Sequence, residues 1–144
     1  MDACQVGYNA AEPVLASDPI TAKILIVDDD EGVIQTFATI LRMEGYHVRT
    51  AMTAETGLRV AEESHPDAII LDLRMPLLDG LGFLRRLRAS DEQRGTPVAI
   101  VTGDYFLEDD LSLELRELGA ELRFKPMWLE DLVGLARNLL GATH

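Results

Sequence analysis

The sequence has little cysteine, few aromatic residues and no long apolar run. Its one cysteine, Cys4, excludes an internal disulfide, and this usage suits a reducing cytosol. No apolar run approaches the ~18 residues that a membrane span requires, and the N-terminus lacks the basic and apolar regions of a secretory signal. We therefore expect a cytoplasmic protein with no membrane partner.

Basic residues are also scarce relative to acidic ones. The chain has 13 Lys and Arg against 25 Asp and Glu, which gives a formal net charge of −12. Because nucleic acids are bound by a surplus of Lys and Arg, this balance argues against a nucleic-acid partner. Apolar residues make up 47% of the 144 residues, enough for one domain with one core.

The chain divides into three parts. Residues 1–21 contain turn-forming residues without periodicity, and we interpret them as a flexible N-terminal arm. Residues 22–141 form the predicted domain, and residues 142–144 a C-terminal tail. Within the domain, strands are predicted at 23–27, 46–51, 67–71, 97–101 and 122–124, each followed by an amphipathic helix. Asp30 and Thr53 stand where helix N-caps are expected.

Five strand–helix repeats predict a parallel sheet with helices on both faces. Right-handed crossovers leave few arrangements, and the flavodoxin-like order 2-1-3-4-5 is usual at this size. The predicted fold is therefore α/β, a three-layer (βα)5 sandwich of the flavodoxin-like type. Only a short tail follows the last helix, so we expect a stand-alone domain.

Polar residues follow directly after four of the five predicted strands. Asp28 and Asp29 follow the first strand, Asp72 the third, Thr102 the fourth and Lys125 the fifth. In such sheets ligands bind beyond the carboxyl ends of the strands, so these side chains should converge. Any one of them has a ready structural explanation as a cap or turn residue; the conjunction of all five indicates a functional site.

Three converging carboxylates repel one another, by about 4 kcal/mol per pair at ~4 Å and an effective dielectric near 20. A hard divalent cation relieves this repulsion, with Mg²⁺ as the first choice and Mn²⁺ or Ca²⁺ next. Lys125 offers a charge, and Thr102 a hydroxyl, to a phosphoryl group. Phosphoryl transfer requires this kind of positioning and neutralisation, with Asp72 as the candidate nucleophile.

Together these motifs resemble the receiver domain of bacterial two-component systems. The resemblance covers about residues 22–141 and rests on four segments, 24–31, 67–80, 101–103 and 124–126. It implies that Asp28 and Asp29 hold Mg²⁺ and that Asp72 is both a ligand and the phosphoacceptor. Arg74 would lend its backbone carbonyl to the metal.

The resemblance also implies roles outside the metal site. Thr102 and Lys125 would contact the phosphoryl group, and the Lys125–Pro126 bond would be cis. A sensor histidine kinase or phosphotransfer protein would donate the phosphoryl group, and water would remove it. The face of the fourth helix, fifth strand and fifth helix would then shift for an unknown downstream effector protein, which leaves a phosphorylation-dependent dimer open. Such a domain is a phosphoacceptor and not an enzyme with a separate substrate.

The chain departs from the family pattern near its last strand. Leu122 stands where an aromatic residue is usual, and the segment 119–125 is one residue short, so the usual coupling of Thr102 to an aromatic side chain is in doubt. Two other residues, Arg74 and Asp104, can pair across the site. We expect such a pair to hinder the water that attacks the phosphoryl group.

Two other functions compete with this interpretation. A phosphatase of the haloacid-dehalogenase class would use the Asp-x-Asp of residues 28–30, but Gly32 stands where that class requires Thr or Val. A receiver-like interaction module that never carries phosphate is the other, favoured by Leu122 and opposed by the complete acidic site. A flavin-binding module of similar fold would need phosphate-cradling residues where Asp28 and Asp29 stand.

Overall fold

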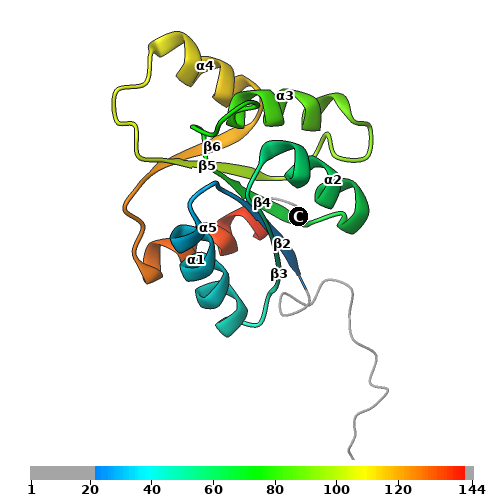
Figure 1. Cartoon of the computed structure of the whole chain (residues 1–144), viewed down its shortest axis with the longest axis vertical. Coiled ribbons are helices and arrows are strands. Elements are labelled where there is room, and N and C mark those ends of the chain that lie inside the picture. Colours follow the sequence, from blue (N-terminus) through cyan, green and yellow to red (C-terminus); the bar gives the residue numbers. More distant parts are fainter. Residues whose placement is uncertain (1–21, 142–144) are drawn as a thin grey trace, which may run out of the picture.

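The structure, a computed structural model, describes residues 22–141 (Figure 1). The predicted arm 1–21 and tail 142–144 lie outside the described residues. Strands and helices alternate in the order β2 (Lys23–Val27), α1 (Glu31–Met43), β3 (His47–Ala51), α2 (Ala54–Ser64), β4 (Ala68–Leu71), α3 (Gly80–Ala89), β5 (Val98–Thr102), α4 (Asp109–Glu117), β6 (Ala120–Phe124) and α5 (Leu129–Gly141).

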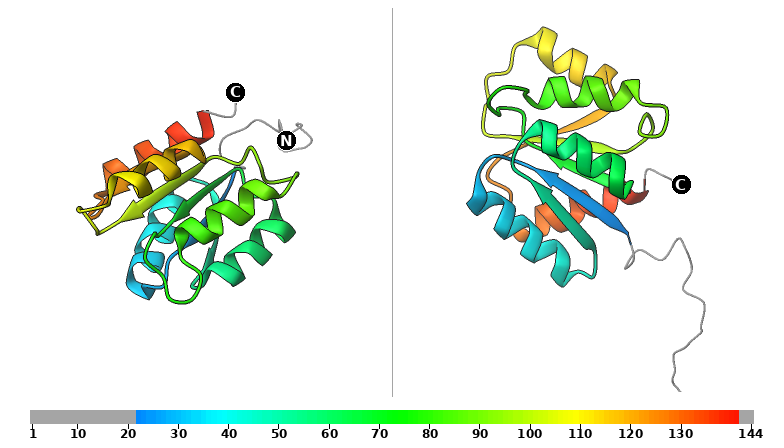
Figure 2. Two further views of the ribbon diagram at one scale, coloured as in Figure 1. Left: turned by 90° about the horizontal axis from the view of Figure 1, so that it is seen from above. Right: turned by 45° about the vertical axis from the view of Figure 1, so that its right-hand side comes forward.

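The strands form one parallel sheet in the order β3-β2-β4-β5-β6. Numbered from the first strand of the domain, this is the order 2-1-3-4-5, so the predicted flavodoxin-like topology is confirmed. Helices α1 and α5 cover one face of the sheet, and α2, α3 and α4 cover the other (Figure 2). Among residues 22–141, none of the helices combines the length and apolar character needed to cross a bilayer.

Each face of the sheet has its own apolar core. The core under α1 and α5 is built on Ile24, Ile26 and Ile70, which alternate with residues that point to the other face. The core under α2 and α3 contains Phe83, which is fully buried, and the opposite-facing strand residues. Because β2, β4 and β5 are covered on both faces, their apolar runs are nearly continuous.

Local signals in the sequence set most helix starts. The carboxylate of Asp30 accepts the backbone N–H groups of Gly32 and Val33 at the start of α1, and the Thr53 hydroxyl caps α2, both as predicted. Three predicted strands differ at an end by one residue, and one strand differs by two. Strand β6 begins at Ala120 and not at residue 122, because it pairs with β5 from Val98 onward. Helix α4 begins at Asp109 and fully buries only Leu115, while Leu111 and Leu118 pack partly buried against the core under α2 and α3.

Candidate functional site

Three aspartates converge at the carboxyl edge of the sheet. Asp28 and Asp29 follow β2, Asp72 follows β4, and one carboxylate oxygen from each lies within 4.8 Å of the others. Asp28 and Asp72 are buried, with 3% and 7% of their surface exposed, whereas Asp29 is exposed. The convergence expected from strand order is therefore present, because β2 and β4 are hydrogen-bonded neighbours that end side by side.

Lys125 enters the same cluster from the end of β6. Its Nζ donates to Asp28 Oδ2 at 2.9 Å and to Asp72 Oδ1 at 3.3 Å. Its backbone N–H donates to the carbonyl oxygen of Thr102 at 2.8 Å, and the following bond to Pro126 is cis, as the resemblance implied. The ammonium group of Lys125 thus donates to two buried carboxylates, which lie 97 and 53 residues before it in the sequence.

The protonation of these groups follows from burial and mutual charge. Burial raises the pKa of the Asp72 carboxyl to about 6, the negative charge of Asp28 acts in the same direction, and Lys125 opposes both. Burial lowers the pKa of the Lys125 ammonium, but its hydrogen bond to Asp28 and the two carboxylate charges outweigh burial, so its pKa is raised. Because Lys125 lies closer to Asp28 than to Asp72, it leaves the Asp72 charge only partly compensated.

The two buried aspartates differ in how their oxygens are used. Asp28 Oδ1 accepts the backbone N–H of Asp30 at 2.9 Å and Oδ2 accepts from Lys125, so both oxygens are engaged. Asp72 accepts one hydrogen bond on Oδ1, and among residues 22–141 its Oδ2 has no hydrogen-bond donor. Asp72 therefore has one carboxylate oxygen that no donor in this range engages, whereas each oxygen of Asp28 already accepts one hydrogen bond.

The loop after Asp72 folds back closely against it. The backbone N–H of Gly80 donates to the carbonyl oxygen of Leu73 at 2.9 Å. A Cβ at position 80 would lie 2.5 Å from the Asp72 carbonyl oxygen, a distance that real Cβ atoms do not show. Only glycine lets this loop start α3 so close to Asp72.

Thr102 and Arg74 lie around the cluster in different ways. Thr102 ends β5 fully buried, and its Oγ1 accepts the backbone N–H of Asp104 at 3.1 Å. The Arg74 guanidinium donates to Asp104 Oδ2 at 2.7 Å, which confirms the predicted pair, although both side chains are partly exposed to water. The hydrogen bonds from Arg74 and from the backbone N–H of Phe106 lower the pKa of the Asp104 carboxyl.

Sequence reasoning missed an aromatic pair beside Lys125. The rings of Tyr105 and Phe124 stack with centroids 5.5 Å apart and planes 20° apart, and the Tyr105 hydroxyl donates to the backbone carbonyl oxygen of Lys125. Leu122, two residues earlier in β6, packs instead against the core under α2 and α3. The signal for Tyr105 was its place two residues after Gly103, at the carboxyl end of β5.

The cluster suits a hard divalent cation. Its donors are three carboxylate oxygens within one ion's reach, and the uncompensated repulsion at Asp72 is what a cation would relieve. The Arg74 backbone carbonyl, the fourth predicted ligand, stays a prediction. Mg²⁺ is the expected ion because such sites leave positions for phosphate oxygens and water.

Fold and site together define a class of protein, a flavodoxin-like domain with an acidic cluster and a lysine at the carboxyl edge of its sheet. The profile of the response regulator receiver domain matches residues 24–136. The chain therefore belongs to the receiver domain family of response regulators, which are phosphoacceptor signalling domains that bind Mg²⁺ at an acidic pocket.

Named relatives agree with this assignment. The transcriptional regulatory protein PrrA of Mycobacterium tuberculosis is 37% identical over 119 residues, which are 82% of this chain and 49% of PrrA. The regulatory protein AtoC of Escherichia coli is 32% identical over 76% of this chain and 23% of AtoC. The chain spans about half the length of the first curated relatives it matches.

Solved structures show the same fold. The chemotaxis protein CheY4 of Vibrio cholerae superimposes with a TM-score of 0.77 at 29% identity, over 83% of this chain and 99% of that one. A CheY-like receiver domain protein of Methanospirillum hungatei superimposes with a TM-score of 0.78 at 28% identity, over 85% and 95% of the two chains.

Proposed function

We propose that this domain accepts a phosphoryl group on Asp72 from a phosphohistidine, in a reaction that depends on Mg²⁺. The observation that carries the proposal is the geometry of Asp72. Its carboxylate is buried beside Asp28 and Lys125, and among residues 22–141 its Oδ2 is not engaged by any donor. The donor would be a sensor histidine kinase or a phosphotransfer protein, the partners that the family uses.

In the proposed step, Asp72 Oδ2 attacks the phosphorus atom of the phosphohistidine. The oxygen–phosphorus bond forms, the phosphorus–nitrogen bond breaks, and its electron pair stays on the imidazole nitrogen, which takes a proton from water. The product is an acyl phosphate on Asp72. Lys125 already lies between Asp28 and Asp72 and can turn its N–H groups to a phosphoryl oxygen.

Other residues of the chain hold the reactants. Thr102 uses its Oγ1 as an acceptor for Asp104, so its hydroxyl proton stays available for a phosphoryl oxygen. Asp28, Asp29, Asp72 and the Arg74 carbonyl would hold Mg²⁺, which when bound supplies positive charge against the phosphoryl oxygens. Arg74 and Asp104 stand at the mouth of the site and would slow the entry of the hydrolytic water.

The output of the domain would be a change in the face formed by α4, β6 and α5. Exposed apolar side chains lie on or beside these elements, among them Leu113, Phe124 and Trp128. Phosphorylation adds charge and acceptor oxygens next to Thr102 and Lys125, both of which adjoin this face. An effector protein, or a second copy of the domain, would bind the face in its shifted state.

The test is intact-mass analysis after incubation with Mg²⁺ and acetyl phosphate. We expect the wild type to gain one phosphoryl group, Asp72→Asn to gain none, and chelation of Mg²⁺ to abolish the gain. Unmodified wild-type protein that is folded and binds Mg²⁺ would favour the interaction module instead. Release of phosphate from many donor molecules per chain, lost in Asp28→Asn, would favour the haloacid-dehalogenase type of chemistry.

A further inference from the structure

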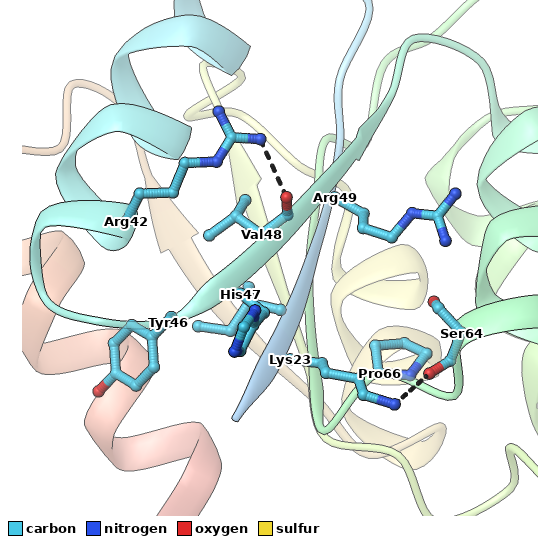
Figure 3. A pocket seen from close by; sticks show the side chains of 9 residues that line it. Lys23, Arg42, Tyr46, His47, Val48, Arg49, Ser64 and Pro66 are labelled. Atoms are coloured by element: carbon cyan, nitrogen blue, oxygen red, sulfur yellow. Dashed lines mark hydrogen bonds between the residues drawn. The ribbon is translucent and has the colours of Figure 1, made fainter. Parts of the chain in front are cut away.

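A basic groove lies at the amino ends of β2 and β3, opposite to the acidic cluster. It has a volume of about 680 Å³ and crosses the edge strand β3, from the last turn of α1 to the end of α2 (Figure 3). Its polar lining includes Lys23, Arg42, His47 and Arg49. We call the pocket that these residues line the basic groove.

The charge of this groove is the reverse of the charge of the chain. Three of the 13 Lys and Arg residues line it, and within residues 22–141 no Asp or Glu does, although the chain carries a net charge of −12. Two acidic residues adjoin lining residues in the sequence. The carboxylate of Asp67 is already engaged by the backbone N–H of Lys23 at 2.8 Å, and Glu63 is exposed and not part of the lining. The groove therefore attracts an anionic group that its own walls do not supply.

The basic side chains keep donors that the domain does not use. Arg42 donates one N–H to the carbonyl oxygen of Val48, at 3.0 Å, and Lys23 donates one to the carbonyl oxygen of Ser64, at 3.2 Å. Within residues 22–141, the Arg49 guanidinium makes no hydrogen bond or ion pair, and Figure 3 shows it extended away from β3. A guanidinium offers five N–H donors and an ammonium three, so most of these donors have no acceptor within residues 22–141.

The occupant of the groove should bind through its side chains and not as an added strand. Strand β3 is an edge strand, and Val48 and Thr50 turn their backbone groups outward because their neighbours His47 and Ala51 bond to β2. Arg42 already covers the Val48 carbonyl oxygen, so a strand could not form a full ladder there. Carboxylates facing Lys23, Arg42 and Arg49 meet the unused donors instead.

We infer that the occupant is the segment 1–21 of this same chain. The segment has three acidic residues, Asp2, Glu12 and Asp18, and no Lys or Arg. It joins the domain at the groove, since the Ala22 carbonyl oxygen accepts the His47 N–H at 3.0 Å and Lys23 is a lining residue. Asp18 is four residues from Ala22 and can reach at most about 14 Å, within range of the groove.

Attachment favours this segment over a separate acidic partner. A tethered ligand has an effective concentration on the order of millimolar, so a few exposed ion pairs are enough to hold it. Its prolines at 13 and 19 lack a backbone N–H and are poor in a ladder, which fits binding by carboxylates. Bound in this way, the segment covers the exposed edge of the sheet and its surplus positive charge.

The single cysteine makes the inference testable in the full chain. A nitroxide spin label is attached to Cys4, and the broadening of each backbone amide signal is measured by NMR. An undocked segment would place the label on average about 20–25 Å from residue 22, in all directions. A docked segment should broaden the amides of β3 and of the last turn of α1 selectively.

Charge changes separate docking from chance proximity. Arg49→Glu should reduce the broadening at β3 about two- to fivefold, the change for one lost exposed ion pair, and so should the triple change Asp2→Asn, Glu12→Gln and Asp18→Asn. The matched control is Arg86→Glu, an exposed arginine on α3 outside the groove, which should change nothing. About 1 M salt should also release the segment, because the screening length is then about 3 Å.

Two results would overturn the inference. The first is broadening around residue 22 that is even in all directions and the same in Arg49→Glu and Arg86→Glu. The second is selective broadening of β3 that appears only when spin-labelled chains are mixed with isotope-labelled, label-free chains, which would make a second copy the occupant.

Discussion

The two ends of the parallel sheet carry opposite charges. At the carboxyl ends, Asp28, Asp29 and Asp72 lie together, and the ammonium group of Lys125 donates to Asp28 and Asp72. At the amino ends, the basic groove is lined by cations, and in the described part of the chain no carboxylate lines it. The acidic residues Asp28 and Asp72 are buried, whereas Arg42, His47 and Arg49 are exposed.

This difference in burial separates a chemical site from a docking surface. Buried charges of one sign raise each other's free energy, and that excess is released when a cation or phosphoryl group arrives. Exposed charges are solvated and cost little, but each pair that they form is worth only ~0.2–1 kcal/mol. The carboxyl edge therefore suits a covalent event, and the groove suits a weak, salt-sensitive one.

The largest effect should come from replacing Lys125, whose ammonium group lies in the acidic cluster. Lys125→Met should slow phosphorylation by acetyl phosphate about 100-fold, because a donor aimed at the phosphoryl oxygens is lost from a buried site. The control is Arg123→Met, which removes a nearby exposed cation paired with Glu121. Rates measured by intact mass that differ less than threefold between the two variants would contradict a chemical role for Lys125.

Neutralising Asp72 should stabilise the metal-free protein. The pKa of Asp72 is raised from 3.8 to about 6, so the folded state binds its proton more tightly and stability falls as pH rises through this range. Asp72→Asn should therefore gain about 1–3 kcal/mol in the free energy of unfolding at pH 7 without Mg²⁺. The gain should shrink as the pH falls from 6 towards 4, and also when Mg²⁺ is added.

Urea unfolding curves measure this gain. Asp110→Asn, at an exposed position in the first turn of α4, is the matched change of charge and should shift stability by at most about 0.5 kcal/mol. A loss of stability in Asp72→Asn at pH 7 would show that the charges of the cluster are already compensated without a metal.

In the basic groove, by contrast, removing a charged side chain should destabilise the folded protein. Arg42→Ala removes the donor that covers the Val48 carbonyl oxygen on the edge strand, and should cost about 0.5–1.5 kcal/mol. Arg86→Ala, an exposed arginine on α3, should cost less than about 0.5 kcal/mol in the same urea experiment. Equal costs for both variants would mean that water replaces the Arg42 hydrogen bond fully.

The smallest effect concerns the exposed ion pair of Arg74 and Asp104. Arg74→Ala should speed the loss of phosphate from Asp72 up to about fivefold, since an exposed ion pair holds Asp104 in place only weakly. Arg85→Ala breaks a similar exposed pair with Glu114 away from the site and serves as the control. An unchanged lifetime in Arg74→Ala would remove the pair from the mechanism.

Features coded by neighbouring residues could be predicted. The caps at Asp30 and Thr53 depend on hydrogen bonds to residues two or three positions away, so their sequence signal is local. The start of β6 was wrong by two residues because Ala120 is held by pairing with β5, a contact between distant segments. The stack of Tyr105 on Phe124 was missed for the same reason.

The sequence by itself determined the sheet order and the convergence of Asp28, Asp29, Asp72 and Lys125. Apolar periodicity identifies the strands, and parallel strands must place the residues that follow them at one edge. Only the tertiary structure decided that, among residues 22–141, Asp72 and not Asp28 has an oxygen without a donor, and that cations of α1, β2 and β3 form one groove. Both depend on side-chain distances of a few ångströms between segments whose separation along the chain carries no such information.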